Sequence, residues 1–504
     1  MAIQQDPSAL LSAPPSTKQS NHACLTRTST SYTPLHTFAL PKGAERQYQQ
    51  QYADMYFSRL AMLKPAIEKQ ALDAWGSFTL GGETARRVER VLDVRQGDLC
   101  WVIGTCYMEM PLKPNVLDDI SKEHWIAAPP PRATYGATGG RAGEAMLEDE
   151  SGRLRLTGSF LDSCMLVTGA IIAVLGTENK DGDFEALDLR LPDLAPQPER
   201  WEGVEGKLAM EGEKGKIAIV SGLGISGDEG DALALDVLME YLLGEAATEE
   251  DQKTIATVSR LIIAGDALAN ASPIPSREEV LATKKAGNAA HNRKYGYDSS
   301  SYNAAPTDRL DTFLATLLPS IPITILPGIH DPTSTSLPQQ PLHAALLPHS
   351  RAYMQPPGST TPSWLDSTTN PAEFICSGLR FLGTGGQPIE DIAKYILPST
   401  TTSTTTTPES RLEIIESTLR WRLTAPTAPD TLPCYPFQEG DAFVINHCPH
   451  VYIVGNQPRF ETRLIHGPDG QSVRLIAVPR FKVTGELVLL DLESLVPELV
   501  RFEV

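Results

Sequence analysis

The chain has 504 residues, of which 41 % are hydrophobic and 21 % are charged, values typical of a soluble globular protein with two or three domains. Its formal net charge of −19 argues against a broad surface for nucleic-acid backbones, because binding phosphates requires clustered basic side chains. No stretch is apolar and long enough to span a bilayer, and we expect no secretory signal at the N-terminus.

The first part of the chain changes in character near residue 44. Residues 1–43 are rich in Ser, Thr, Gln and Pro and poor in large apolar side chains, which predicts disorder. Residues 44–85 are predicted to be a helical segment, in which Pro65 breaks or kinks the helix. The apolar residues at helical spacing are Tyr48, Tyr52, Met55, Tyr56, Leu60 and Leu63. Such a stripe packs on its own domain more often than on a partner.

Residues 86–195 are predicted to form a small Greek-key barrel of the OB type, because short alternating strands follow one another. We expect the strands at Leu99–Met110, Ala145–Phe160 (a hairpin), Val167–Gly176 and Phe184–Leu191. OB barrels often bind single strands through aromatic rings beside basic residues, but the strand with Trp101 and Tyr107 carries no basic residue. A barrel that packs against protein is therefore favoured, and a single-strand-binding module is the alternative.

Residues 200–504 follow an α/β pattern. Repeated strand–helix–strand units predict a largely parallel inner sheet covered by helices, and several further strands follow Phe374. The Ser/Thr run at residues 399–407 contains no core-forming side chain and is predicted to be a disordered surface insert. The expected fold class is therefore an OB-type β-barrel packed with an α/β sandwich, preceded by an N-terminal helical segment.

A glycine-rich turn, Gly222–Gly227, matches the G-x-G-x-x-G pattern between a strand and a helix. Asp228, Glu229 and Asp231 lie at the start of that helix, where their carboxylates would repel a pyrophosphate. The next strand ends at Asp266, too far along the chain for a compact dinucleotide-binding unit. Binding of NAD or FAD is therefore not favoured, and we expect no cofactor.

A second interpretation compares turns at strand ends with the ligand blocks of dinuclear phosphoesterases, which hold two metals with His and Asp side chains. The calcineurin-like family has five short segments that supply these ligands, and each has a counterpart at a strand end of this chain. The matching positions are Gly222, Gly224, Asp266, Ile329, His330, Thr384, Asn456 and Pro458.

Among these positions only Asp266 clearly keeps a metal ligand. Glycine, isoleucine and proline side chains cannot coordinate a metal, and one carboxylate cannot hold two divalent ions. In the active family the counterparts of His330 and Asp331 assist the chemistry; here we expect structural roles for both, with Asp331 in a turn before Pro332. No catalytic residue and no metal site are therefore expected, and a divergent metallophosphoesterase is the alternative.

Several longer strings give a more specific resemblance. They are Leu326–Gly328, Asp331–Thr333, Leu337–His343, Phe381–Gln387, Pro426–Leu432, Cys434–Phe437 and Cys448–Tyr452. In order and spacing, these strings resemble the small (B) subunits of the replicative DNA polymerases, and among them the polymerase delta small-subunit family of the fungal type. That family combines an OB fold with a calcineurin-like phosphoesterase domain that has lost its ligands.

The resemblance implies a non-catalytic scaffold in DNA replication and repair. It implies two partners, the C-terminal cysteine-rich module of the polymerase delta catalytic subunit and the third polymerase delta subunit. The catalytic subunit of polymerase zeta is a further partner that the resemblance allows. Little or no direct DNA binding and no membrane contact are expected. The 7 dispersed cysteines indicate reduced thiols in a cytosolic or nuclear protein, and the resemblance implies the nucleus.

Overall fold

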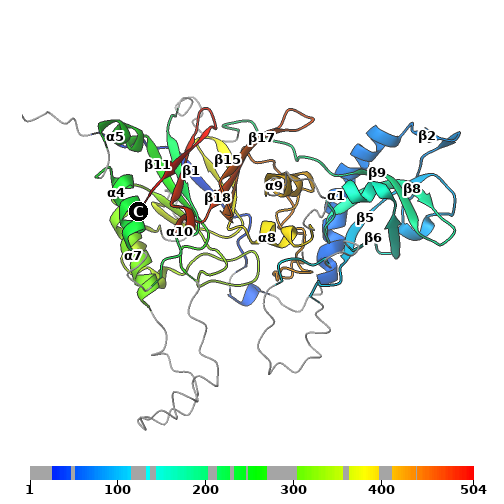
Figure 1. The fold of residues 1–504 in the computed structure, drawn as a ribbon, viewed down its shortest axis with the longest axis horizontal. Coiled ribbons are helices and arrows are strands. Elements are labelled where there is room, and N and C mark those ends of the chain that lie inside the picture. The colour runs from blue at the N-terminus through cyan, green and yellow to red at the C-terminus, as the bar shows by residue number, and fades with distance from the viewer. Residues whose placement is uncertain are drawn as a thin grey trace, which may run out of the picture.

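The computed structural model describes most of the chain (Figure 1). The described residues are 25–41, 43–46, 52–114, 132–136, 143–202, 213–226, 232–245, 248–269, 304–355, 363–396, 411–438 and 440–503. The disorder predicted for residues 1–24 and for the insert at 399–407 concerns segments outside this set. Among the described residues no helix is long and apolar enough to cross a membrane.

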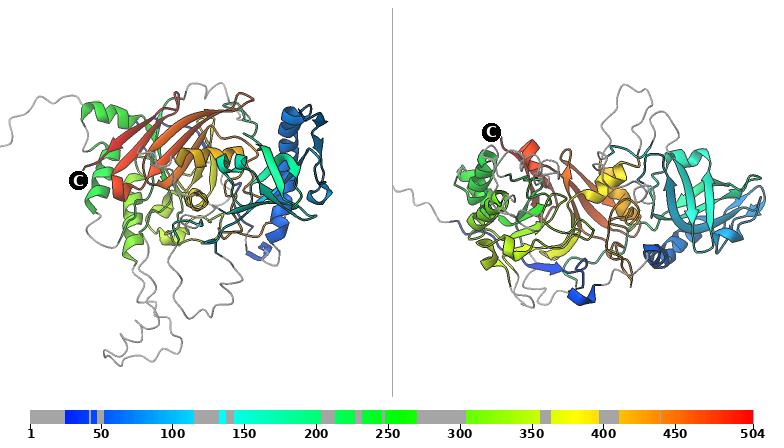
Figure 2. Two further views of the ribbon diagram at one scale, coloured as in Figure 1. Left: turned by 45° about the vertical axis from the view of Figure 1, so that its right-hand side comes forward. Right: turned by 90° about the horizontal axis from the view of Figure 1, so that it is seen from below.

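A small β-barrel lies at one end of the molecule (Figure 2). Its strands are β4 (Arg86–Arg87), β5 (Cys100–Glu109), β6 (Glu144–Glu148), β7 (Arg153–Thr157), β8 (Ile171–Glu178) and β9 (Phe184–Arg190). They pair in the order β4-β5-β6-β7-β9-β8, and the additional pairing of β5 with β8 closes the barrel. The predicted OB-type barrel is therefore confirmed. A short hairpin, β2 (Thr79–Leu80) with β3 (Glu83–Thr84), precedes it.

Helix α1 (Tyr52–Trp75) packs against the barrel strands β5, β8 and β9. The prediction that Pro65 ends or kinks a helix that begins near Ala44 is only partly right, because α1 begins at Tyr52 and continues ten residues beyond Pro65 to Trp75. The proline removes one hydrogen bond, to the carbonyl of Ala61. Pro65 and Ala61 both lie on the exposed side, where water can bind that carbonyl. Burial of Ile67, Ala71 and Trp75 holds the second half of α1 on the barrel.

The rest of the chain forms a sandwich of two six-stranded sheets. One sheet has the order β13-β12-β11-β10-β19-β20 and the other has the order β1-β14-β15-β16-β18-β17. The strands of the first sheet are β10 (Lys216–Val220), β11 (Val258–Ala264), β12 (Ile323–Leu326), β13 (Leu365–Ser367), β19 (Glu486–Asp491) and β20 (Pro497–Arg501). Those of the second are β1 (Tyr32–Leu35), β14 (Ala372–Cys376), β15 (Leu379–Thr384), β16 (Val451–Gln457), β17 (Glu461–His466) and β18 (Ser472–Pro479).

Buried apolar side chains fill the space between the sheets and cover both outer faces. Ile219, Ile262, Phe381, Ile453 and Ile476 share the inner core. The first sheet is covered by α4 (Ala232–Leu243), α5 (Glu249–Ala256), α7 (Ala305–Leu317) and α10 (Phe481–Thr484). The second sheet is covered by α8 (Gln387–Ala393) and α9 (Arg411–Arg420) on the side that faces the barrel. One continuous core therefore runs from the barrel through α1, α8 and α9 to the second sheet.

The N-terminal region contributes a strand to the sandwich, so the predicted disorder of residues 1–43 is wrong for residues 25–41. Strand β1 pairs antiparallel with β14, in a register that places Tyr32 opposite Cys376. Composition alone suggested disorder because large apolar residues are sparse here. Tyr32 and Phe38 are 4 % and 3 % exposed, and polar side chains such as Arg27 and Thr30 supply further anchors.

Candidate functional site

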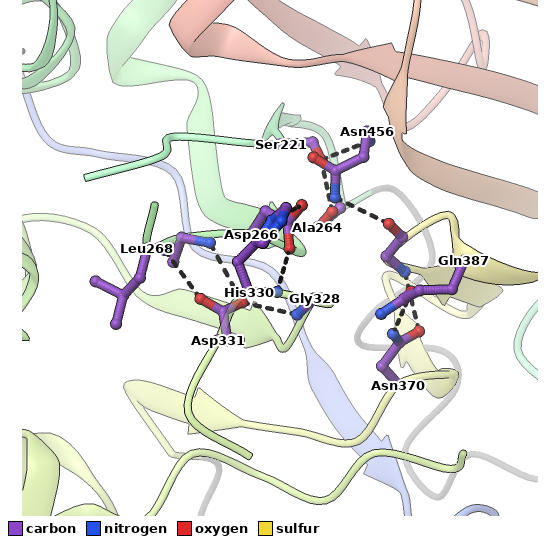
Figure 3. Close-up of polar contacts among 12 residues, drawn as sticks. Ser221, Ala264, Asp266, Leu268, Gly328, His330, Asp331, Asn370, Gln387 and Asn456 are labelled. Atoms are coloured by element: carbon purple, nitrogen blue, oxygen red, sulfur yellow. Dashed lines mark hydrogen bonds and ion pairs between the residues drawn. The ribbon is translucent and has the colours of Figure 1, made fainter. Parts of the chain in front are cut away.

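The five turns that resemble phosphoesterase blocks meet at one place between the two sheets (Figure 3). Three of them follow the parallel strands β10, β11 and β12, and two lie at the carboxyl ends of the parallel strands β15 and β16. Gly222 N donates to Gly265 O at 2.9 Å, and Asn456 N donates to Ser221 Oγ at 2.8 Å. Asn456 Nδ2 donates to Gly385 O at 2.9 Å. The carboxyl ends of these strands therefore bring all five turns together, as the chain order suggested.

The positions of Gly222 and Gly224 are enclosed by side chains from other segments. A Cβ atom at 222 would lie 2.7 Å from Asn456 Oδ1 and 2.9 Å from Arg480 Cβ. A Cβ atom at 224 would lie 2.8 Å from Lys482 Cδ. Both glycines also have φ values near +60°, a left-handed conformation that disfavours most residues other than Asn and Asp. A side chain at 222 would have to displace Asn456 and Arg480, whereas one at 224 would have to displace only the flexible end of Lys482.

Asp266 and His330 contact each other. The backbone N of His330 donates to Asp266 Oδ1 at 3.0 Å, and His330 Nδ1 lies 3.0 Å from Asp266 Oδ2. The Asp266 side chain is buried, whereas that of His330 is 32 % exposed. The one retained ligand residue is therefore bonded through both carboxylate oxygens to the turn after β12. Among the described residues, no group of three or more His, Cys, Asp and Glu side chains could hold a metal ion.

Asp331 closes the same turn from the inside. Its carboxylate accepts from the backbone N of Gly328 at 2.7 Å, of Leu268 at 2.9 Å and of Ala267 at 3.3 Å. Burial raises the pKa of Asp331 to about 6, although these N–H donors oppose the shift. The three hydrogen bonds tie the turn after β11 to the turn after β12. This geometry agrees with the structural role expected for Asp331.

Thr384 belongs to a polar network that sequence reasoning missed. Asn370 Oδ1 accepts from Thr384 Oγ1 at 3.1 Å and from Gly385 N at 2.9 Å. Asn370 Nδ2 donates to Gln339 Oε1 at 2.8 Å and to Gln387 Oε1 at 2.9 Å. Gln339 and Gln387 both lie inside the sequence strings that resemble the family. Membership of these strings was the only sequence feature that could have pointed to the two residues. Amide side chains therefore bridge the turns after β12 and β15.

The remaining predicted positions lie partly outside this cluster. Asn456 is 5 % exposed with a φ of 57°, and its Oδ1 has no hydrogen-bond partner among the described residues. Ile329 is 63 % exposed, so its side chain points away from the cluster. Pro458 is exposed just beyond β16. The structure thus brings together Gly222, Gly224, Asp266, His330, Thr384 and Asn456, whereas Ile329 and Pro458 face the surface.

The aromatic residues of β5 were the other candidate site. Trp101 is 1 % exposed, and its ring centroid lies 6.0 Å from that of Trp75 in α1. Tyr107 is partly exposed, with Lys113 Nζ 4.3 Å and Arg153 Cζ 4.7 Å from its ring centroid. These basic residues come from outside β5, so inspection of the strand alone missed them. Trp101 is a core residue and cannot stack on a base, which favours packing against protein.

Two family models assign this barrel and sandwich to the class of small, or B-type, subunits of DNA polymerases. The family model for the DNA polymerase delta subunit OB-fold domain matches residues 51–189. The family model for the B-type subunits of DNA polymerases alpha and epsilon matches residues 217–462. These two matches cover the barrel with α1 and most of the sandwich.

Curated relatives narrow the class. The DNA polymerase delta small subunit of Saccharomyces cerevisiae is 34 % identical over 91 % of both chains. That of Arabidopsis thaliana is 34 % identical over 88 % of this chain and 90 % of its own. The DNA polymerase delta subunit 2 of Drosophila melanogaster is 30 % identical over 95 % of this chain and 99 % of its own. The chain belongs to the family of DNA polymerase delta small subunits, which are accessory and not catalytic subunits.

Proposed function

We propose that this chain is the non-catalytic scaffold of a DNA polymerase delta complex in replication and repair. In this proposal it joins the C-terminal cysteine-rich module of the catalytic subunit to the third, elongated subunit. It also serves polymerase zeta where that enzyme is present, and it works in the nucleus. The names of its relatives support membership of a polymerase complex. The continuous core from barrel to sandwich supports a rigid body on which two partners can be held at a fixed separation.

The packing around Gly222 and Gly224 is the main support for a non-catalytic role. Asn456, Arg480 and Lys482 fill the space where two ligand side chains would begin. Asp266 and His330 are engaged with each other, and two groups of this kind cannot supply the ligand set of a dinuclear site. We therefore assign no catalytic or metal-binding role to these positions. The strand-end turns persist as structural joints between the two sheets.

Reconstitution tests the bridging role. The catalytic chain and the third subunit are co-expressed with and without this chain, and a tag on the third subunit is used for purification. We expect the catalytic chain to be recovered in near-stoichiometric amount only when this chain is present. Equal recovery in its absence would contradict a bridge between the two partners.

A hydrolysis assay tests the alternative of a divergent phosphoesterase. The purified chain and its Asp266→Ala variant are incubated with manganese and a chromogenic phosphodiester. We expect neither protein to hydrolyse the substrate faster than the buffer blank, because Asp266 and His330 alone cannot form a dinuclear metal site. Manganese-dependent hydrolysis by the natural chain that disappears in Asp266→Ala would establish the enzyme instead.

Titration with a labelled single strand tests the OB-module alternative. Because Trp101 is buried, the informative substitution is Arg153→Gln, whose side chain is 53 % exposed beside Tyr107. We expect no affinity in the micromolar range at physiological salt. Micromolar binding that weakens steeply with salt and is lost in Arg153→Gln would support a single-strand-binding module.

A further inference from the structure

Residues 25–41, here called the clasp, run along one side of the sandwich and contain β1, the edge strand of the second sheet (Figure 1). The backbone of the clasp joins the second sheet, where β1 forms the edge next to β14. Its side chains reach the first sheet. Tyr32 Oη donates to Asp366 on β13, and Arg260 Cζ of β11 lies 3.7 Å from the centroid of the Tyr32 ring. One short segment therefore holds the two sheets together at one side.

Arg27 anchors the start of the clasp. Its Nη1 donates to Ile255 O at 3.0 Å and to Val258 O at 3.1 Å. Its Nη2 donates to Leu242 O at 2.8 Å and to Ser320 Oγ at 3.1 Å. Leu242 and Ile255 lie in the last turns of α4 and α5, where carbonyl oxygens lack helical partners and favour a cation. The guanidinium thus ties two helices and the start of β11 to the N-terminal segment.

The other end of the clasp reaches the turn after β12. Leu40 N donates to Gln340 Oε1 at 3.1 Å, and Gln340 Nε2 donates to Phe38 O at 3.3 Å. Between the two ends, Thr30 Oγ1 donates to Ser259 Oγ at 2.9 Å. Side-chain anchors therefore occur along the whole length of the clasp, in a segment with few apolar residues.

We propose that the clasp is a self-supplied edge strand that occupies the β14 edge and thereby keeps this edge from pairing with a second copy of the chain. Without β1, β14 would present an unpaired row of N–H and C=O groups beside an opened core that includes Phe374. Such an edge is a template for pairing with another chain. A second copy offers the same edge in the antiparallel orientation that β1 now uses.

Cleavage after folding tests the clasp without requiring a truncated chain to fold. A protease recognition sequence is placed between Arg46 and Tyr52 of the full chain, and the folded protein is cut. We expect the N-terminal fragment to stay bound during gel filtration. A denaturant concentration below the unfolding transition then releases the fragment and is dialysed away, so that the large piece never unfolds. We expect the large piece to form concentration-dependent dimers that an added peptide of residues 25–41 returns to monomers.

Variant peptides test which contacts hold the clasp. We expect a labelled Arg27→Ala peptide to bind the large piece at least tenfold more weakly than the natural peptide. Thr33→Ala is the matched control, because Thr33 lies exposed on β1, and it should bind with unchanged affinity. A large piece that stays monomeric and melts at the temperature of the uncut chain would overturn the proposal. Equal affinity of the Arg27→Ala and natural peptides would overturn the role of Arg27.

Discussion

Arg59 is a fully buried guanidinium in α1 that joins three parts of the chain. Its Nε donates to Asp441 Oδ2 at 2.6 Å, and its other nitrogens donate to the carbonyls of Gly169, Pro426 and Ala428. Both side chains of the Arg59–Asp441 pair are 0 % exposed. A charged residue in the apolar stripe of α1 gave no sign of burial in the sequence, because its acceptors come from the barrel and from distant loops.

Replacing Arg59 should therefore loosen the junction between barrel and sandwich. We expect Arg59→Ala to lower the free energy of unfolding by roughly 3–5 kcal/mol, because it leaves the carboxylate of Asp441 buried and unpaired. Denaturant titration followed by circular dichroism measures the change. Arg86→Ala is the control; its ion pair with Asp98 is exposed and should cost less than about 1 kcal/mol. Equal effects of the two substitutions would contradict the assigned role of Arg59.

His450 provides a pH-dependent test at the start of β16. Burial, together with the charges of Arg200 and Arg380, lowers the pKa of His450 below its ordinary 6.5. Its Nδ1 accepts from Arg380 N at 3.0 Å, so the neutral ring is the form that fits. As the pH falls below 6.5, the unfolded chain takes up this proton first. The stability that His450 contributes is thus present above that pH and is lost below it.

The variant His450→Asn keeps an acceptor near the position of Nδ1 but cannot titrate. Melting temperatures of both chains are measured at intervals from about pH 7.5 to about pH 5.5. We expect the natural chain to lose stability more steeply than the variant over this window. Parallel curves would show that His450 does not titrate differently in the folded and unfolded chains.

At the scale of elements, the strand ends of the two sheets touch at Gly455. A Cβ atom there would overlap Ala264 O at the end of β11 and lie 2.5 Å from Ser221 Oγ. We expect Gly455→Ala to cost about 3 kcal/mol of unfolding free energy or more, because backbone atoms on both sides would have to shift. Gly152→Ala is the control, since the side chain it would approach, Leu92, is 64 % exposed and can move. Chemical denaturation distinguishes the two variants.

Some helices and strands could be predicted from the sequence and others could not. Alternation predicted β5 and β9 to within a few residues, because their side chains face a core on at least one side. The unbroken course of α1 through Pro65 to Trp75 was not predicted, because local propensity does not include the burial of Trp75 against Trp101. Strand β1 was missed because its anchors, such as Arg260 and Asp366, lie more than 200 residues away in the sequence.

For the whole molecule, the sequence predicted which turns form the candidate site but not which side chains pack around them. Chain order placed Gly222, Asp266 and His330 in neighbouring turns, and the structure joins those turns. Chain order could not show that Arg480 and Lys482 pack where ligand side chains would start, because neither belongs to a motif. The function was likewise predicted from long sequence strings shared with a family. A non-catalytic scaffold has no catalytic residues from which its function could be recognised.

This chain is an accessory, non-catalytic subunit of a DNA polymerase. The most direct test is a purification of the tagged chain under native conditions, with quantification of co-purifying chains and metal analysis of the separated small chain. We expect one large B-family polymerase chain for each copy of this chain, and far less than one divalent ion per small chain. Recovery without any polymerase chain, together with bound manganese or zinc in stoichiometric amount, would contradict the account.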